Sequence, residues 1–179
     1  MTEAASVDIR EAVAGDAQAL LDFMARAAQQ SDYISAADWA GYDAASLAHF
    51  LEQECERLGH LCLVATLGTR VIGLCHISRD QEPMLYHIGQ VFLVVDRDFW
   101  GQGLAQVLLE VACDWADHTP DLAKLALTVQ ARNHAATHIY EKFGFAIEGK
   151  HPYGAQTREG DFLDTYSMGR LTDQAYDTR

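Results

Sequence analysis

The sequence has few prolines, few basic residues and no long apolar run. Only 3 of its 179 residues are proline, and no Gly/Ser-rich stretch interrupts the chain, so we expect one domain over residues 1–179. The chain holds 13 Lys and Arg against 26 Asp and Glu, which gives a formal net charge of −13. Because phosphate backbones are bound by clustered Lys and Arg, nucleic acid and anionic membrane surfaces are disfavoured as partners.

Secretion signals and metal motifs are also missing from the pattern. The first ten residues contain no apolar core of a signal peptide, and no run approaches the roughly 18 apolar residues of a spanning helix. The four cysteines, Cys55, Cys62, Cys75 and Cys113, form no CxxC pair. We therefore expect reduced, mostly buried thiols in a cytoplasmic protein, and no disulfide framework.

Two histidines have the spacing of metal ligands without the rest of a metal motif. His134 and His138 are four residues apart, but Ala135 stands where the zinc-protease pattern requires glutamate. We interpret them as the exposed flank of a helix and expect no metal.

Periodicity and glycine positions predict an alternation of strands and helices. Strands are expected at 7–10, 60–66, 70–78, 86–95, 125–129, 145–148 and 162–170, and helices after Asp16, over 44–58, from Leu104 and from Asn133. The continuously apolar run 91–95 is typical of a strand covered on both faces. This order predicts an α+β or mixed α/β domain around one twisted sheet.

The most informative segment is a strand, a glycine turn and a helix, residues 92–105. Glycines in such a turn allow unusual dihedral angles, and a helix N-terminus offers free N–H groups to a phosphate. A tight packing turn would fit the glycines almost as well. The loop is neither a Walker A motif, since Gly103 is followed by Leu104, nor a Rossmann fingerprint, since Gln106 replaces the third glycine.

Two separated motifs resemble those of the GCN5-related N-acetyltransferases. The family's acetyl-CoA loop, Arg/Gln-x-x-Gly-x-Gly/Ala, corresponds to residues 100–105, although Trp100 stands where Arg or Gln is usual. Residues 133–145 follow the family's pattern Asn-x-x-Ala-x-x-hydrophobic-Tyr-Glu-Lys-x-Gly-Phe almost residue for residue. The resemblance covers nearly the whole chain.

This resemblance implies a fold, a reaction and a cosubstrate. The fold is a central, mostly antiparallel mixed sheet flanked by about four helices, with two strands splayed at the cofactor site. The reaction is direct transfer of an acetyl group from acetyl-CoA to a primary amine of a small molecule or peptide. The alternative is a non-catalytic acyl-CoA-binding sensor or interaction module of the same fold. The resemblance leaves the oligomeric state open, although dimers are common among similar proteins and a homodimer is one candidate assembly.

Site residues follow from the same resemblance. The residues expected to bind acetyl-CoA are Phe92, Leu93, Val94, Gly101, Gln102, Gly103, Leu104, Ala105, Gln106 and Asn133. Tyr140 is expected to be the general acid for the leaving thiolate, since a phenol stays protonated at neutral pH. Without the motif, a core aromatic would be the better interpretation of Tyr140.

The base that neutralises the amine is not defined by the motifs. Some family members use a glutamate five residues before the asparagine, where this chain has Thr128. His87 is the candidate with a suitable intrinsic pKa, with Glu82 and Asp164 as weaker ones, and an ordered water could replace a dedicated base. His87 could equally be a hydrogen-bonded strand histidine.

The acceptor is expected beside the first two helices. Asp32, Tyr33 and Trp39 are candidates to line it, although the aromatic residues could equally pack two helices together. Residues 1–60 carry 11 acids and 3 bases, so Asp32, Asp38 and Asp43, together with Glu52, Glu54 and Glu56, are candidates to attract a cationic amine. An ordinary solvated helix face is the alternative for the three glutamates.

Overall fold

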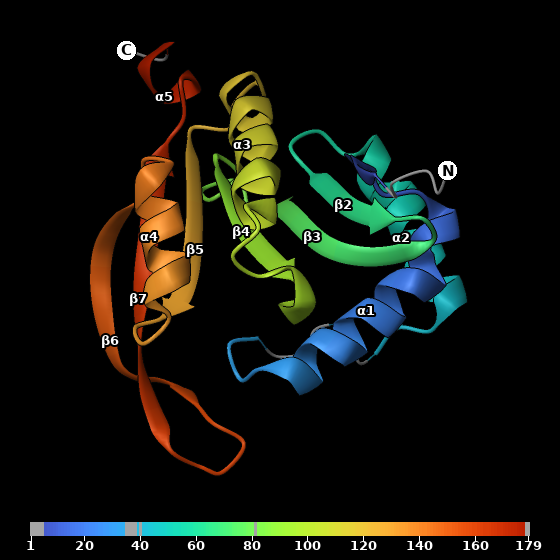
Figure 1. The fold of residues 1–179 in the computed structure, drawn as a ribbon. Coiled ribbons are helices and arrows are strands. Elements are labelled where there is room, and N and C mark those ends of the chain that lie inside the picture. Colours follow the sequence, from blue (N-terminus) through green and yellow to red (C-terminus); the bar gives the residue numbers. More distant parts are fainter. Residues whose placement is uncertain (1–5, 35–38, 40, 81, 178–179) are drawn as a thin grey trace.

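A seven-stranded sheet runs through the molecule (Figure 1). The structure, a computed structural model, describes residues 6–34, 39, 41–80 and 82–177. The strands are β1 (Val7–Glu11), β2 (Leu61–Leu67), β3 (Arg70–Arg79), β4 (Ile88–Val95), β5 (Lys124–Gln130), β6 (Ala146–Gln156) and β7 (Phe162–Leu171). The helices are α1 (Ala17–Gln30), α2 (Ala44–Glu56), α3 (Leu104–Asp117), α4 (His134–Lys142) and α5 (Gln174–Asp177), with short 3₁₀ turns η1 (Ala14–Asp16) and η2 (Arg97–Phe99).

The sheet is antiparallel except at one position. Its strand order is β1-β2-β3-β4-β5-β7-β6, and only β4 and β5 pair in parallel. Between β2 and β3, a two-residue turn has Gly68 at φ +60°, a conformation that favours glycine. The predicted mixed, mostly antiparallel sheet is thereby confirmed.

The parallel pair separates after three residues. Ile88, Gly89 and Gln90 of β4 pair with the first three residues of β5, and no pairing follows. The rest of β5 pairs with β7 alone, while β4 continues to pair with β3 up to Val95. From residue 91 onwards, the β5-facing edge of β4 therefore has no strand partner.

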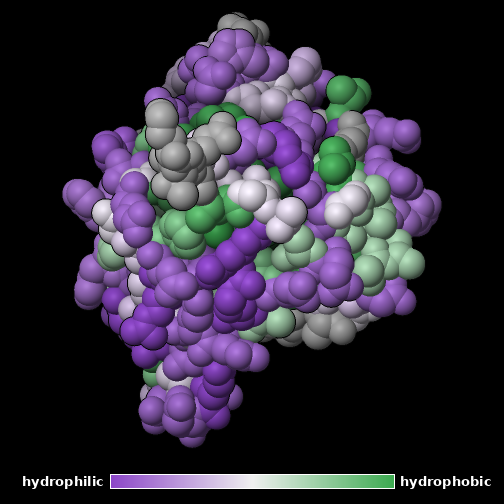
Figure 2. All heavy atoms as spheres, turned by 45° about the vertical axis from the view of Figure 1, so that its right-hand side comes forward, coloured by the Kyte–Doolittle hydropathy of each residue, from purple (hydrophilic) through white to green (hydrophobic). Residues whose placement is uncertain are grey.

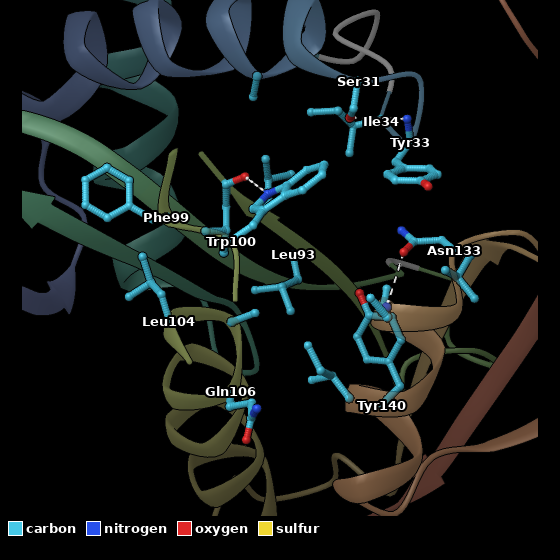
Figure 3. Close-up of a pocket in the computed structure, with 18 of the residues that line it drawn as sticks. Ser31, Tyr33, Ile34, Leu93, Phe99, Trp100, Leu104, Gln106, Asn133 and Tyr140 are labelled. Atoms are coloured by element: carbon cyan, nitrogen blue, oxygen red, sulfur yellow. Dashed lines mark hydrogen bonds between the residues drawn. The ribbon is translucent and has the colours of Figure 1, made fainter. Parts of the chain in front are cut away.

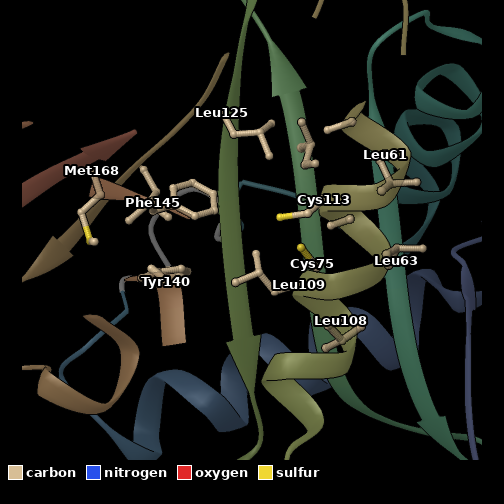
Figure 4. Close-up of a cluster of buried hydrophobic side chains, with 14 of the residues drawn as sticks. Leu61, Leu63, Cys75, Leu108, Leu109, Cys113, Leu125, Tyr140, Phe145 and Met168 are labelled. Carbon is tan, nitrogen blue, oxygen red and sulfur yellow. The ribbon is translucent and has the colours of Figure 1, made fainter. Parts of the chain in front are cut away.

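Helices cover both faces of the sheet, and each face has its own apolar core. Cys75 and Ile77 of β3 face α3 and α4, in the cluster drawn in Figure 4. Val71 and Leu74 belong to the cluster under α1 and α2. From Leu74 to Ile77 the faces alternate with the period of two of a strand. A register shift opposite Ala65 and Thr66 breaks this alternation at Ile72, so Val71 joins Leu74 on the same face.

Several boundaries differ from the sequence-based prediction. β4 begins at Ile88, so His87 lies in the turn before it, and α2 ends at Glu56. β6 has 11 residues, whereas the sequence predicted four. It is an exposed edge strand that contains two register shifts and Pro152. Edge strands tolerate proline and lack alternation, which conceals them in a sequence.

The cysteines and the helix lengths bear on two further expectations. Cys62, Cys75 and Cys113 are buried, as predicted for most of the thiols. None of the helices in the described part of the chain is long and apolar enough to cross a membrane. The visible face in Figure 2 is mostly hydrophilic.

Candidate active site

A cavity of about 590 Å³ occupies the opening between β4 and β5. This volume is within the range of small-molecule sites. Its walls come from the end of α1, the free half of β4, the loop before α3, the end of β5 and the start of α4. Figure 3 shows Ser31, Tyr33 and Ile34 above the cavity, Phe99, Trp100 and Leu104 on one side, and Asn133 and Tyr140 on the other.

The glycine loop presents free N–H groups at the start of α3. Gly101 and Gly103 have φ values of +73° and +82°, and a Cβ built on either would meet no atom within 4 Å. Glycine is therefore needed for its dihedral angles rather than for space. Gly103 caps α3 without a side-chain hydrogen bond, so the first-turn N–H groups remain available to an anion.

Trp100 forms a wall of the cavity instead of a basic contact. Its indole Nε1 donates to the carbonyl oxygen of Val95 at 2.8 Å. Its ring stacks on Tyr33, with centroids 6.2 Å apart. The departure from the family's usual Arg or Gln therefore joins the glycine loop to the segment after α1.

Asn133 and Tyr140 form the opposite wall. The Asn133 side-chain oxygen accepts from the backbone N–H of Ala136 and caps α4, which leaves its NH₂ group to donate elsewhere. Tyr140 is 8% exposed, packs against Phe145 at 5.7 Å between ring centroids, and faces the cavity. Burial raises the pKa of Tyr140 above its usual value of 10, so the phenol is a proton donor at neutral pH.

Most of the predicted cofactor residues meet at this cavity. Those that line it are Phe92, Leu93, Val94, Gly101, Gly103, Leu104, Ala105, Gln106 and Asn133. Gln102 does not, because its side chain turns back to donate to the carbonyl oxygen of Asp98 at 3.0 Å. The predicted acid, Tyr140, and one predicted acceptor residue, Tyr33, also line the cavity.

Other predicted residues lie elsewhere. His87 is exposed in the turn before β4 and is not among the lining residues. Trp39 is buried in the core beneath α1 and α2, with its ring 6.4 Å from that of Tyr42. Trp39 therefore packs between two helices, the alternative that the sequence left open, and does not line the cavity. Asp164 pairs with Lys150, whose Nζ lies 2.8 Å away.

Three of the acidic candidates, Asp32, Asp43 and Glu54, have structural partners. Asp32 pairs with Arg158, whose Nε lies 3.5 Å from Oδ1, and Asp43 caps α2 through Ser46. Glu54 is buried and contacts His60, His76 and Arg57. Asp38 lies outside the described residues. The cavity lining contains no Asp or Glu within the described ranges.

Sequence reasoning missed several lining residues, among them Gln30, Ser31, Ile34 and Arg132. Gln30, Ser31 and Ile34 follow or end α1, and Arg132 stands between β5 and Asn133. Gln30 also connects the end of α1 to the loop before α3, since it donates to Asp96 and accepts from the backbone N–H of Arg97. The only sequence signal for Arg132 was its place directly before the asparagine of the motif.

An unpaired strand edge, an uncapped helix N-terminus and a buried tyrosine together fit the thioester and phosphates of an acyl-CoA. These features define the class of acyl-CoA-dependent transferases. Within the described residues, the cavity joins both faces of the sheet, so that a donor and an acceptor can meet in it.

Comparisons with known proteins identify the family. The model of the acetyltransferase (GNAT) family matches residues 17–145, and the chain belongs to this family. The L-amino acid N-acetyltransferase of Escherichia coli K12 is 31% identical over 67% of this chain and 74% of its own. A GNAT-family acetyltransferase structure from Streptococcus pneumoniae is 38% identical, with a TM-score of 0.89 over 93% of this chain and 99% of that one.

A more distant structure shares the fold. The phosphinothricin acetyltransferase of Sinorhizobium meliloti, in complex with acetyl-CoA, has a TM-score of 0.81 at 16% identity, covering 97% of this chain and 92% of that one. The predicted family, fold and enzyme class, an acetyl-CoA-dependent N-acetyltransferase, are confirmed.

Proposed function

We propose that the chain transfers an acetyl group from acetyl-CoA directly to the primary amine of a small molecule or peptide inside this cavity. The observation that carries the proposal is the separation of β4 from β5 after Gln90. It exposes a strand edge between the α3 N-terminus and Tyr140. The E. coli relative is named for L-amino acids, so α-amines are the first acceptors to test.

The donor would be held by backbone groups more than by side chains. Residues 91–95 offer N–H and C=O groups along the open edge of β4, which suits the amides of an extended pantetheine arm. The N–H groups at residues 101–106 suit the pyrophosphate. Asn133, with its free NH₂ group, would donate to the arm from the opposite wall.

Tyr140 would stabilise the leaving thiolate. The amine nitrogen attacks the thioester carbonyl carbon, the C–S bond breaks, and the amine loses a proton to water. Because a thiol has a pKa near 8.5 and burial raises the pKa of Tyr140, complete proton transfer is uphill. A hydrogen bond from the phenol to the developing thiolate therefore supplies most of the stabilisation, and solvent completes the protonation.

The amine would be neutralised by water. No carboxylate lines the cavity within the described residues, and His87 is outside it. Thr128 lines the cavity at the position where some family members have a glutamate. Its hydroxyl can orient a water but cannot hold a proton at neutral pH. Asp32, Asp43 and Glu54 are paired elsewhere, so the proposed acceptor is not a cation recognised by these carboxylates.

Acetyl transfer to a panel of amines, with the products weighed by mass spectrometry, tests the proposal. Tyr140→Phe should lower kcat by about 10²-fold with little change in acetyl-CoA binding. The matched control is Tyr166→Phe, because Tyr166 is a tyrosine of β7 that does not line the cavity. Binding of CoA without turnover of any amine would favour the non-catalytic module. Light scattering distinguishes a monomer from the candidate homodimer.

A further inference from the structure

Four side chains form a row along the α1 side of the cavity. Arg97 lies over the ring of Trp100, with its Cζ 5.9 Å from the centroid. Trp100 stacks on Tyr33, and Arg132 lies over Tyr33 with its Cζ 5.5 Å from the centroid. The row thus begins with Arg97 beside the glycine loop and ends with Arg132 at the junction of β5 and α4.

Arg132 is held in place at one edge of its guanidinium only. Its Nε donates to the side-chain oxygen of Gln130 at 3.0 Å, and Gln130 in turn donates to the backbone carbonyl oxygen of Asp32. The described residues give the two terminal nitrogens of Arg132 no hydrogen bond and no ion pair. A planar guanidinium fixed at Nε and supported by a ring presents a two-pronged donor to a carboxylate.

The charges around this end of the cavity leave Arg132 unneutralised. Among the described lining residues, Arg132 and His134 are the basic side chains, and there is no acid. The nearest acid along the facing segment, Asp32, is paired with Arg158 of the β6–β7 connection. In a chain of net charge −13, this end of the cavity is therefore suited to an anion.

We infer that Arg132 binds the carboxylate of the acceptor, and that the acceptor is an α-amino acid with an apolar side chain. The inference rests on the proposed function. Arg132 comes shortly after Thr128 and Val129, which also line the cavity. In an α-amino acid a single carbon joins the amine to the carboxylate. A carboxylate bound by Arg132 therefore keeps the amine at that end of the cavity. Tyr33, Ile34 and Trp100 offer the side chain an apolar wall (Figure 3).

A cofactor phosphate is the competing anion. The N–H groups that suit a pyrophosphate lie at residues 101–106, next to Trp100 and at the other end of the row. Arg132 is separated from them by the Tyr33–Trp100 pair. The geometry therefore favours the acceptor as its ligand.

The test compares L-leucine with 3-methylbutylamine, which has the same branched chain and amine but no carboxylate. Rates are expressed per concentration of unprotonated amine, because the two amines differ in pKa. For the wild type, kcat/KM should be about tenfold or more higher for leucine than for 3-methylbutylamine. In Arg132→Gln this ratio should fall to about one, through the KM of leucine, with the KM of acetyl-CoA unchanged.

Two further variants separate the geometry of the contact from charge and from folding. Arg132→Lys keeps the charge but loses the fork, and should recover only part of the leucine KM. Arg97→Gln removes the exposed guanidinium at the other end of the row and should leave the leucine KM unchanged. Because Arg132 is exposed, all variants should keep the wild-type thermal unfolding temperature.

Calorimetric titration of leucine and 3-methylbutylamine into the CoA complex provides a readout without turnover. Leucine binding that depends on Arg132 supports the inference even if no amine is acetylated, in which case the proposed function alone fails. Equal binding of leucine and 3-methylbutylamine overturns the inference. A defect of Arg132→Gln confined to the KM of acetyl-CoA also overturns it and assigns the guanidinium to a phosphate. Equal use of L-serine and L-leucine would overturn the apolar side chain.

Discussion

Asp96 connects the loop before α3 to the first helix and the sheet. Its carboxylate is 0% exposed and accepts hydrogen bonds from Arg26 at 2.9 Å, Arg70 at 2.7 Å and Gln30 at 3.0 Å. It also accepts from the backbone N–H of Asp98 and so caps η2. Asp96→Asn removes the charge while keeping the size of the side chain.

The magnitude follows from the pKa of this carboxyl group. Burial alone would raise the pKa of Asp96, but hydrogen bonds from Gln30, Arg70 and Arg26 outweigh it and lower the pKa to about 2 from 3.8. At about 1.36 kcal/mol per pH unit, the ionised carboxylate contributes about 2 kcal/mol to the free energy of unfolding. A lowered pKa makes this contribution complete above about pH 4, and it is lost as the pH falls through about 2.

Urea unfolding of Asp96→Asn and wild type between pH 7 and pH 2 measures this contribution. The variant should be less stable by about 2 kcal/mol at pH 7, and the two curves should converge between pH 4 and pH 2. Asp98→Asn is the control, because Asp98 is 68% exposed and pairs with the same Arg70; its loss should cost less than about 0.5 kcal/mol. A difference that persists unchanged to pH 2, or none at pH 7, would refute the reasoning.

Three other predictions concern the site and its support. Gly103→Ala should destabilise the protein by about 1 kcal/mol, since φ is +82° and the added Cβ has open space, and should raise the KM of acetyl-CoA; Gly160→Ala, at φ +98° outside the cavity, should lower stability similarly without changing KM. Burial of Glu54 is outweighed by hydrogen bonds from His60 and His76, which lower its pKa to about 2; Glu54→Gln should therefore lower the urea midpoint at pH 7, and the difference should shrink as the pH falls from about 4.5 to 2. The pH profile of kcat/KM should follow the pKa of the acceptor amine and move when acceptors of different pKa are compared; one fixed inflection for all acceptors would indicate a protein base.

The sequence predicted those parts of the site that depend on local backbone chemistry. Gly101 and Gly103 could be recognised because glycine is the residue that tolerates their positive φ. Tyr140 lies on the short helix α4 and Asn133 caps it, both within one dense motif, so their common orientation toward the cavity followed from local spacing. The order of strands and helices was also predictable, because most elements are buried on at least one face and keep their period.

The parts that failed depend on contacts between distant segments. Trp39 and Tyr33 are equally aromatic and six residues apart, yet one packs in the core and the other reaches Trp100. His87 was expected to lie within a strand that begins one residue later. Arg132 lies outside both motifs, directly before one of them, and its neighbour Tyr33 is 99 positions earlier in the chain. Such pairings are decided by tertiary packing, which composition and periodicity do not encode.

The distribution of charge shows the same dependence on packing. The acidic excess of residues 1–60 suggested attraction of a cation, but a carboxylate can only attract a ligand if the fold leaves it unpaired. Glu54 in that segment is buried and contacts Arg57, His60 and His76, and outside the segment Asp96 and Asp117 are likewise paired with arginines. These carboxylates are used inside the body of the protein. Among the described residues that line the cavity, N–H groups and the guanidinium of Arg132 then remain as donors with no acid beside them, a set that suits an anionic group.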